Sequence, residues 1–178
     1  MVCFVGLNPS KATHEVDDHT VRRWRGFAKA WGFGGFFAAN LFALRETHTK
    51  NVESAFLRRG PLWVTHGRMA KERRNDHWTL WALERSELAV ACWGAAPWVE
   101  VGERVEEVER LVQDGKPLHA LKVTKDGHPA HPARLRNGLT PVLWSPPAGL
   151  GLGRRRERTV EPCGEPSTNS ASEADNRS

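Results

Sequence analysis

The chain of 178 residues has only three cysteines, and their spacing does not suit a metal site. Cys3, Cys92 and Cys163 lie far apart with no C-x-x-C pair, which excludes the common zinc-ribbon and iron–sulfur spacings. A sparse, odd cysteine count is typical of the reducing cytoplasm. No apolar run approaches the length of a membrane span. We therefore expect a cytoplasmic protein with no membrane contact.

Three common catalytic motifs are also missing, namely the P-loop, G-x-G-x-x-G and G-x-S-x-G. Their absence removes the usual sequence support for nucleotide hydrolysis, Rossmann-type redox chemistry and ordinary esterase activity. His128 and His131 have the i, i+3 spacing of a metal pair, but no third ligand follows nearby. We predict neither a metal nor a cofactor.

Positive charge is concentrated in the first part of the chain. The net charge is +5, and the five arginines and five acids of residues 151–178 cancel, so residues 1–150 carry all of it. The 151–178 segment is rich in Arg, Ser, Pro and Glu without apolar periodicity, which predicts a disordered tail. Residues 1–150 are predicted to form a single domain. Its basic balance suits a nucleic acid or a phosphorylated small molecule, or only a soluble basic surface.

Strand-like and helix-like segments alternate along residues 1–150. The strands are predicted at 2–7, 36–42, 87–93 and 118–123, with a short fifth segment at 142–144 that either pairs or covers the core. Helices are predicted after Asp18, at 71–85 and at 101–112, whereas 45–67 is predicted to be irregular. This order predicts an α/β fold, a three-layer α/β/α sandwich around a central, mainly parallel four-stranded sheet. Because a buried strand rarely opens a chain, we also expect a missing N-terminal segment.

Each predicted strand ends in a cluster of turn-forming or polar residues. The clusters contain Gly6, Asn8, Pro9 and Ser10; Asn40; Trp93 and Gly94; and His128 with His131. In an open parallel sheet these clusters share the carboxyl edge, where ligands bind. Taken singly, each cluster is also compatible with an ordinary turn.

Several side chains in these clusters suit a binding or catalytic role. Asn40 sits in an apolar run, so its amide needs a partner, either a ligand or the backbone. A histidine in the proline-bracketed loop can donate a hydrogen bond to developing negative charge. Asp17 is a candidate base, and Asp18 is expected to cap the following helix. Trp24, Trp31 and Trp93 belong to the core or line the cleft.

The order of several short stretches carries a family resemblance. These are GLNPS at 6–10, DDHT at 17–20 with Arg22 and Arg23, WGFGG at 31–35, NLFALR at 40–45, Asn75-Asp76, AVACWG at 89–94 and TKDGHPAHP at 124–132. The order closely resembles domain of unknown function family 1643, a bacterial and phage family. The same order more distantly resembles the uracil-DNA glycosylase superfamily.

The second resemblance implies hydrolysis of an N-glycosidic bond. By that resemblance Asn8 orients water, with Asp17 or Asp18 as base, and Asn40 and Arg45 match the stretch that reads the base. His131 or, in the competing register, His128 stabilises the leaving base. Arg134 follows at the position of a wedge for base flipping.

The sequence does not determine whether the substrate is single-stranded, double-stranded or a free nucleotide. We expect the partner to be DNA or a modified nucleotide and the protein to be a monomer. The alternatives are an enzyme acting on a free modified nucleotide and a non-catalytic module that binds nucleic acid or such a nucleotide. A shared fold alone does not decide between them.

Overall fold

The computed structural model describes residues 1–11, 18–59, 74–95, 99–112 and 116–147. The strands are β1 (Val2–Gly6), β2 (Phe36–Asn40), β3 (Leu88–Ala91), β4 (Leu118–Ala120) and β5 (Val142–Leu143). The helices are α1 (His19–Ala30), α2 (Thr49–Arg59), α4 (Asn75–Glu84) and α5 (Val99–Val112), with a 3₁₀ turn η2 (Pro132–Arg134). The tail predicted at 151–178 lies outside the described residues, as does Asp17.

The strands form one mixed sheet in the order β2-β1-β3-β4-β5. The α/β class is as predicted, but the mainly parallel four-stranded sheet is wrong, because β5 adds an antiparallel fifth strand through His119 and Ala120. The described chain between β4 and β5 contains only the short η2 turn and no crossover helix. A strand that returns without a crossover pairs antiparallel, which explains its direction.

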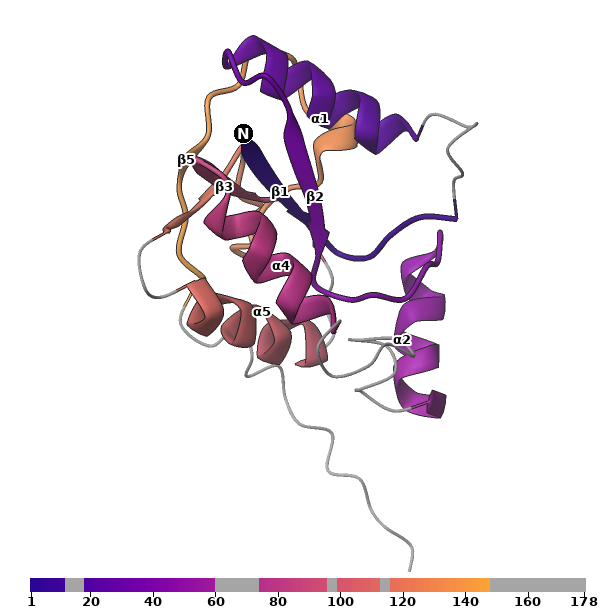
Figure 1. Ribbon diagram of the computed structural model, residues 1–178. Coiled ribbons are helices and arrows are strands. Elements are labelled where there is room, and N and C mark those ends of the chain that lie inside the picture. Colours follow the sequence, from indigo (N-terminus) through magenta and orange to yellow (C-terminus); the bar gives the residue numbers. More distant parts are fainter. Residues whose placement is uncertain (12–17, 60–73, 96–98, 113–115, 148–178) are drawn as a thin grey trace, which may run out of the picture.

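The strand β1 lies between β2 and β3 and is buried on both faces, and its side chains alternate between two apolar clusters. Phe4 packs with Trp24 and Phe27 of α1, whereas Val5 packs with side chains of α4 and α5. Figure 1 shows α1 on one side of the sheet and α4 and α5 on the other. The continuous apolar run at the start of the sequence is therefore explained by helices on both faces.

Helix α1 begins where the sequence predicts, directly after Asp18. The Asp18 carboxylate accepts a hydrogen bond from the Thr20 backbone N–H at 2.6 Å and so caps the first turn. At the other end the Gly32 N–H bonds to Lys29 O and the Phe33 N–H to Ala28 O. Gly32 has a φ of +80°, the left-handed conformation that this termination requires.

The prediction that 45–67 is irregular is wrong over α2. Val52 and Ala55 lie three residues apart and are both buried in the core, so the segment has a short apolar face that is easily missed. The helix ends at Arg59, before the helix-breaking Gly60-Pro61 pair. The predicted helices at 71–85 and 101–112 correspond to α4 and α5. None of the described helices is long and apolar enough to cross a membrane.

Candidate functional site

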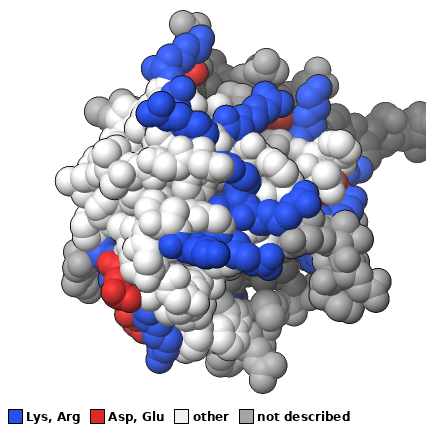
Figure 2. All heavy atoms as spheres, turned by 90° about the horizontal axis from the view of Figure 1, so that it is seen from above, with Lys and Arg blue, Asp and Glu red and all other residues white. Residues whose placement is uncertain are grey.

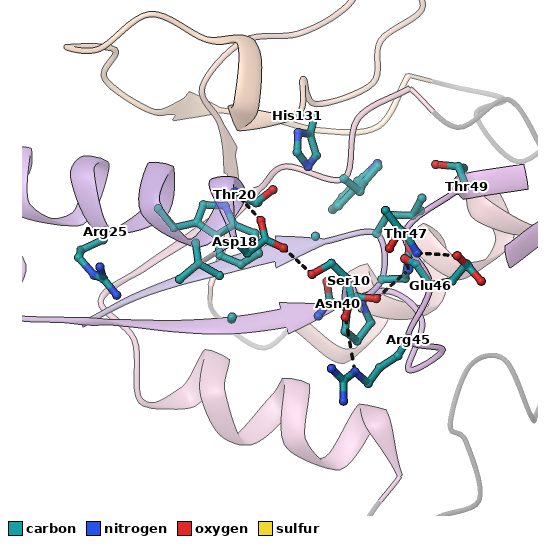
Figure 3. A pocket seen from close by; sticks show the side chains of 18 residues that line it. Ser10, Asp18, Thr20, Arg25, Asn40, Arg45, Glu46, Thr47, Thr49 and His131 are labelled. Carbon is teal, nitrogen blue, oxygen red and sulfur yellow. Dashed lines mark hydrogen bonds between the residues drawn. The ribbon is translucent and has the colours of Figure 1, made fainter. Parts of the chain in front are cut away.

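A cavity of about 770 Å³ lies at the carboxyl ends of β1 and β2 (Figure 3). Gly6 and Asn40, the last residues of these strands, are partners in register. The predicted site residues that line the cavity are Gly6, Asn8, Pro9, Ser10, Asp18, Asn40, Arg45, Trp93 and His131. The fold thus brings residues from four separate parts of the sequence to one place, as expected of this edge.

The Asn40 side chain lies directly against the backbone of Gly6. A Cβ built on Gly6 would lie 2.7 Å from Asn40 Oδ1 and 3.5 Å from the Trp24 ring. Gly6 is therefore needed for space at this point of the strand. Among the described residues, no group forms a hydrogen bond with the Asn40 side-chain amide. Its donor and its acceptor are both left for a ligand or solvent.

Side chains from α4 and α5 hold the backbone at the end of β2. Asn75 Nδ2 donates to Asn40 O at 2.8 Å and to Leu41 O at 3.3 Å. The buried Arg104 donates from Nε to Leu41 O at 2.8 Å and also pairs with Asp76. These donors satisfy carbonyls that the sheet no longer pairs. The Asn75-Asp76 stretch therefore holds the end of β2, a role that sequence reasoning did not assign.

Asn8 holds the loop that follows β2. Its Nδ2 donates to Glu46 O at 2.6 Å, Pro9 O at 3.0 Å and Leu44 O at 3.2 Å. The loop is also tied by the Phe42 N–H to Leu7 O bond at 2.9 Å. Within the described part of the chain the Asn8 Oδ1 has no donor. Asn8 is thus a structural tie through its nitrogen and an available acceptor through its oxygen.

Asp18 is both a helix cap and a wall of the cavity. Besides accepting from Thr20, its carboxylate accepts from the Ser10 hydroxyl, so the loop after β1 is joined to the start of α1 (Figure 3). Burial alone would raise the pKa of Asp18, but the hydrogen bonds from Ser10 and Thr20 outweigh it and lower the pKa below 3.8. The carboxylate is ionised at neutral pH.

His131 presents one defined ring nitrogen to the cavity. Its Nδ1 accepts from the Ala133 N–H at 3.3 Å and caps η2, so the proton of the neutral ring is on Nε2. Loss of solvation lowers the pKa of His131 below 6.5. The Asp18 carboxylate opposes this effect, and the nearby His19 and Arg134 side chains add to it. The neutral ring is therefore a hydrogen-bond donor at pH 7. Figure 3 shows it facing the cavity opposite Asp18.

The remaining predicted residues lie beside the cavity rather than in it. The buried Gly94, at a φ of +83°, packs against His131, whose Cβ would be 3.2 Å from a Cβ on Gly94. His128 is in the turn between Lys122 and Ala130 and does not line the cavity, and its Nδ1 is buried without a partner in the described structure. Of the two registers, only His131 faces the cavity. Arg134 lines a neighbouring cavity with Gly94.

Two tryptophans contribute apolar walls. Trp24 stacks on Phe4 with ring centroids 5.6 Å apart, and Trp93 meets Trp144 edge-on at 5.2 Å. The Trp93 indole N–H is buried with no acceptor in the described structure, which costs about 1–3 kcal/mol unless water or a ligand accepts from it. Trp31 does not line the cavity. Its indole N–H donates to Leu139 O at 2.9 Å.

Charged residues occupy the rim formed by the loop after β2. Glu46 pairs with Lys11 at 2.8 Å, and this contact with the hydrogen bonds from Thr47 and His48 lowers the pKa of Glu46 to about 2. Arg45 Nε donates to Ser10 O at 3.4 Å. Sequence reasoning missed Glu46, Thr20 and Thr49 as lining residues. The only sequence feature that could have indicated them is their position after a predicted strand or helix cap. Many polar residues have such a position without lining a site.

The site residues do not form a metal centre. Among the described residues, no three His, Cys, Asp or Glu side chains are grouped closely enough to hold a metal ion. The available chemistry is that of an amide with two unused hydrogen-bonding sides, an ionised carboxylate and a neutral imidazole donor. This set is suited to binding a polar heterocycle and to separating charge across it.

Comparison with known proteins identifies one family. Neither the curated proteins nor the solved structures include a significant match to this chain. The resemblance to the uracil-DNA glycosylase superfamily therefore rests on the motif order alone. The family model described as "Protein of unknown function (DUF1643)" matches residues 1–133. The chain belongs to the DUF1643 family of proteins of unknown function.

Proposed function

We propose that the protein processes nucleobases by hydrolysing an N-glycosidic bond in the β1–β2 edge cavity. The observation that carries the proposal is the placement of Asp18 and His131 on the same cavity. An ionised carboxylate and a neutral N–H donor face a floor that carries the Asn40 amide. We also propose that the α/β fold is the three-layer sandwich of the uracil-DNA glycosylases, and that the protein is a cytoplasmic monomer that acts on DNA.

The charges of the two side chains match the charge separation of the reaction. As the glycosidic bond breaks, its electron pair leaves with the base and positive charge develops on the sugar. The Asp18 carboxylate stabilises the sugar cation, and His131 Nε2–H donates to the departing base anion. The Asn40 amide pairs with the donor and acceptor edge of the base.

A positioned water completes the reaction. The water oxygen bonds to the sugar carbon, and its proton passes to solvent or to the departing base. The Asn8 Oδ1 is the acceptor that orients this water, because its nitrogen is already held by three carbonyls. The low pKa of Asp18 makes it a weak base, so it acts chiefly by its charge.

The alternative is a binding module without turnover. It is favoured by the three hydrogen bonds of the Asn8 amide and the capping bonds of Asp18, which give both residues a structural purpose that needs no catalysis. Such a module would use Asn40 and His131 to hold a base or a modified nucleotide.

A base-release assay at low salt tests the proposal. The substrates are single- and double-stranded oligonucleotides with uracil, a G·T mismatch, hypoxanthine or 5-hydroxymethyluracil. We expect abasic sites with the wild type, at least about a hundredfold fewer with His131→Ala, which removes the N–H donor, and unchanged release with Ser54→Ala, an exposed α2 residue. No release with retained binding supports the module. Equal release by wild type and His131→Ala would overturn the mechanism.

A further inference from the structure

Exposed basic side chains gather on one side of the sheet, whereas the other side exposes acidic residues together with Arg85 and Arg110. Helix α1 contains four Lys or Arg residues and no Asp or Glu. Arg22, Arg25 and Lys29 are exposed, and their spacing of three and four residues places them along one side of the helix. On the other side of the sheet, α5 exposes Glu103, Glu106 and Glu107.

The basic stripe continues beyond α1 onto the loop that carries His131. Arg134 and Arg136 are exposed in or just after η2. The neighbouring cavity that Arg134 and Gly94 line has a volume of about 720 Å³. Its lining also includes Lys122 and Lys125, and it includes no acidic residue. Seen from the α1 side, Lys and Arg side chains gather across the face and few acidic ones are visible (Figure 2).

Arg23 fastens the two basic segments to each other. Its guanidinium donates to the carbonyls of Pro132 and Leu135 and to the Asn137 side chain, and it lies 4.9 Å over the Phe27 ring. The arrangement of α1 and η2 is therefore held by several bonds from one side chain. A preorganised surface binds with a smaller entropy loss than separate loops would.

The stripe leads to the candidate cavity. Arg25 lines the cavity together with Thr20 and Val21 from the first turns of α1, and His131 lines both this cavity and its neighbour. Arg22 and Lys29 are about 10 Å apart along the helix, which is about three base steps of a nucleic acid strand.

We propose that the surface formed by Arg22, Arg25, Lys29, Arg134 and Arg136 binds the phosphate backbone of a nucleic acid strand and presents one of its bases to the cavity. This inference rests on the proposed function and deepens it, because it names the surface that holds the nucleic acid strand whose base enters the cavity. Phosphates contact the arginine and lysine side chains, while the flipped or unpaired base reaches Asn40.

The absence of acidic residues from α1 argues against a merely soluble surface. A surface built only for solubility carries both signs interspersed, whereas a stripe of one sign orients an approaching polyanion. A free nucleotide carries few phosphates and would not need a stripe that extends along α1 to Lys29 and across to Arg136.

The test compares two double variants with the same total change in charge. Arg22→Glu/Lys29→Glu reverses two charges on the stripe, and the control Arg85→Glu/Arg110→Glu reverses two exposed charges, one just after α4 and one on α5. Binding of labelled single- and double-stranded DNA is followed by fluorescence anisotropy between about 50 and 200 mM salt.

We expect wild-type affinity to fall steeply with salt and the stripe variant to bind at least about tenfold more weakly. Its slope of log affinity against log salt should be smaller by roughly 1.4 on single strands and 1.8 on duplex. The control should bind like the wild type. Circular dichroism checks that both variants fold.

Three outcomes would overturn the inference. These are equal losses in the two double variants, salt-independent binding, and tighter binding to anionic phospholipid vesicles than to DNA. Base release separates this inference from the proposed function. Salt-dependent binding lost only in the stripe variant, with no base release by the wild type, supports the surface and removes the glycosylase. Base release from free nucleosides without any DNA binding supports cleavage of the glycosidic bond and removes the nucleic-acid-binding surface.

Discussion

The Asn40 side-chain oxygen lies so close to Gly6 that a Cβ at position 6 would be only 2.7 Å from it. The ends of the neighbouring strands β1 and β2 are therefore in close contact at the cavity. The oxygen is at the end of a rotatable side chain, so it moves more easily than the backbone does. A substitution at Gly6 is therefore expected to displace the amide and leave the fold intact.

We predict that Gly6→Ala abolishes base recognition with little loss of stability. The new Cβ turns the Asn40 amide away from the cavity, while alanine is favoured over glycine in a strand by roughly 0.5–1 kcal/mol, which offsets the strain. Base release should fall at least about tenfold, and the unfolding free energy in urea should change by less than about 1 kcal/mol. A destabilised variant with wild-type release would contradict this.

The matched control for that variant is Gly26→Ala. Gly26 lies in α1 and does not line the cavity, and a Cβ added there would meet no atom within 4 Å. The substitution should stabilise the protein by roughly 0.5–1 kcal/mol, because alanine is the better helix former. Base release should be unchanged.

The Asn75 side chain is predicted to position Asn40. Asn75→Ala removes the donor to Asn40 O and Leu41 O, which costs about 1–2 kcal/mol in urea unfolding. Asn75→Asp should cost more, because a carboxylate then faces two carbonyl oxygens. Base release should fall in both variants, with a change in kcat rather than only in KM. A stability loss with unaltered kcat would show that Asn75 is structural only.

Arg104 is predicted to be a major source of stability at the same place. Arg104→Met removes the buried donor to Leu41 O and the partner of Asp76 and Glu107. The two carboxylates are partly exposed and can be hydrated, so we expect a loss of about 2–4 kcal/mol rather than more. Arg85→Met, at an exposed pair with Glu84, should change stability by less than about 0.5 kcal/mol. Similar losses in both variants would refute the assignment.

The lowered pKa of His131 predicts a specific dependence of stability on pH. Because the folded pKa is below 6.5, the unfolded chain binds this proton at a higher pH than the folded protein does. The stability that the neutral His131 contributes is therefore fully present above about pH 6.5, and it is lost as the pH falls from there toward the folded pKa. Protonation of Nδ1 also removes the acceptor for the Ala133 N–H. Asp18, whose pKa is lowered below 3.8, contributes stability that is lost only at still lower pH.

The pH prediction is tested with His131→Asn, which keeps a capping acceptor but does not titrate. Urea unfolding at about pH 7.5 and about pH 5.5 should show a smaller difference in stability for this variant than for the wild type. The exposed His48→Asn is the control and should retain the wild-type difference. An equal difference in all three proteins would contradict the assigned pKa shift.

The sequence predicted those parts of the fold that depend on local chemistry. The cap at Asp18 and the helix α5 each follow from a few neighbouring residues. The helix α2 was missed because Val52 and Ala55 give too short an apolar face to be distinguished from a loop.

The sequence by itself determined that polar residues follow each buried strand and that residues 1–150 are basic. Only the tertiary structure decided which of them meet. It placed His131 and not His128 at the cavity, gave Asn75 and Arg104 their carbonyl partners, and joined the basic stripe of α1 to η2 through Arg23. These hydrogen bonds join residues 34 to 112 positions apart, and pairing at such distances depends on the register and packing of the strands. No local pattern encodes it.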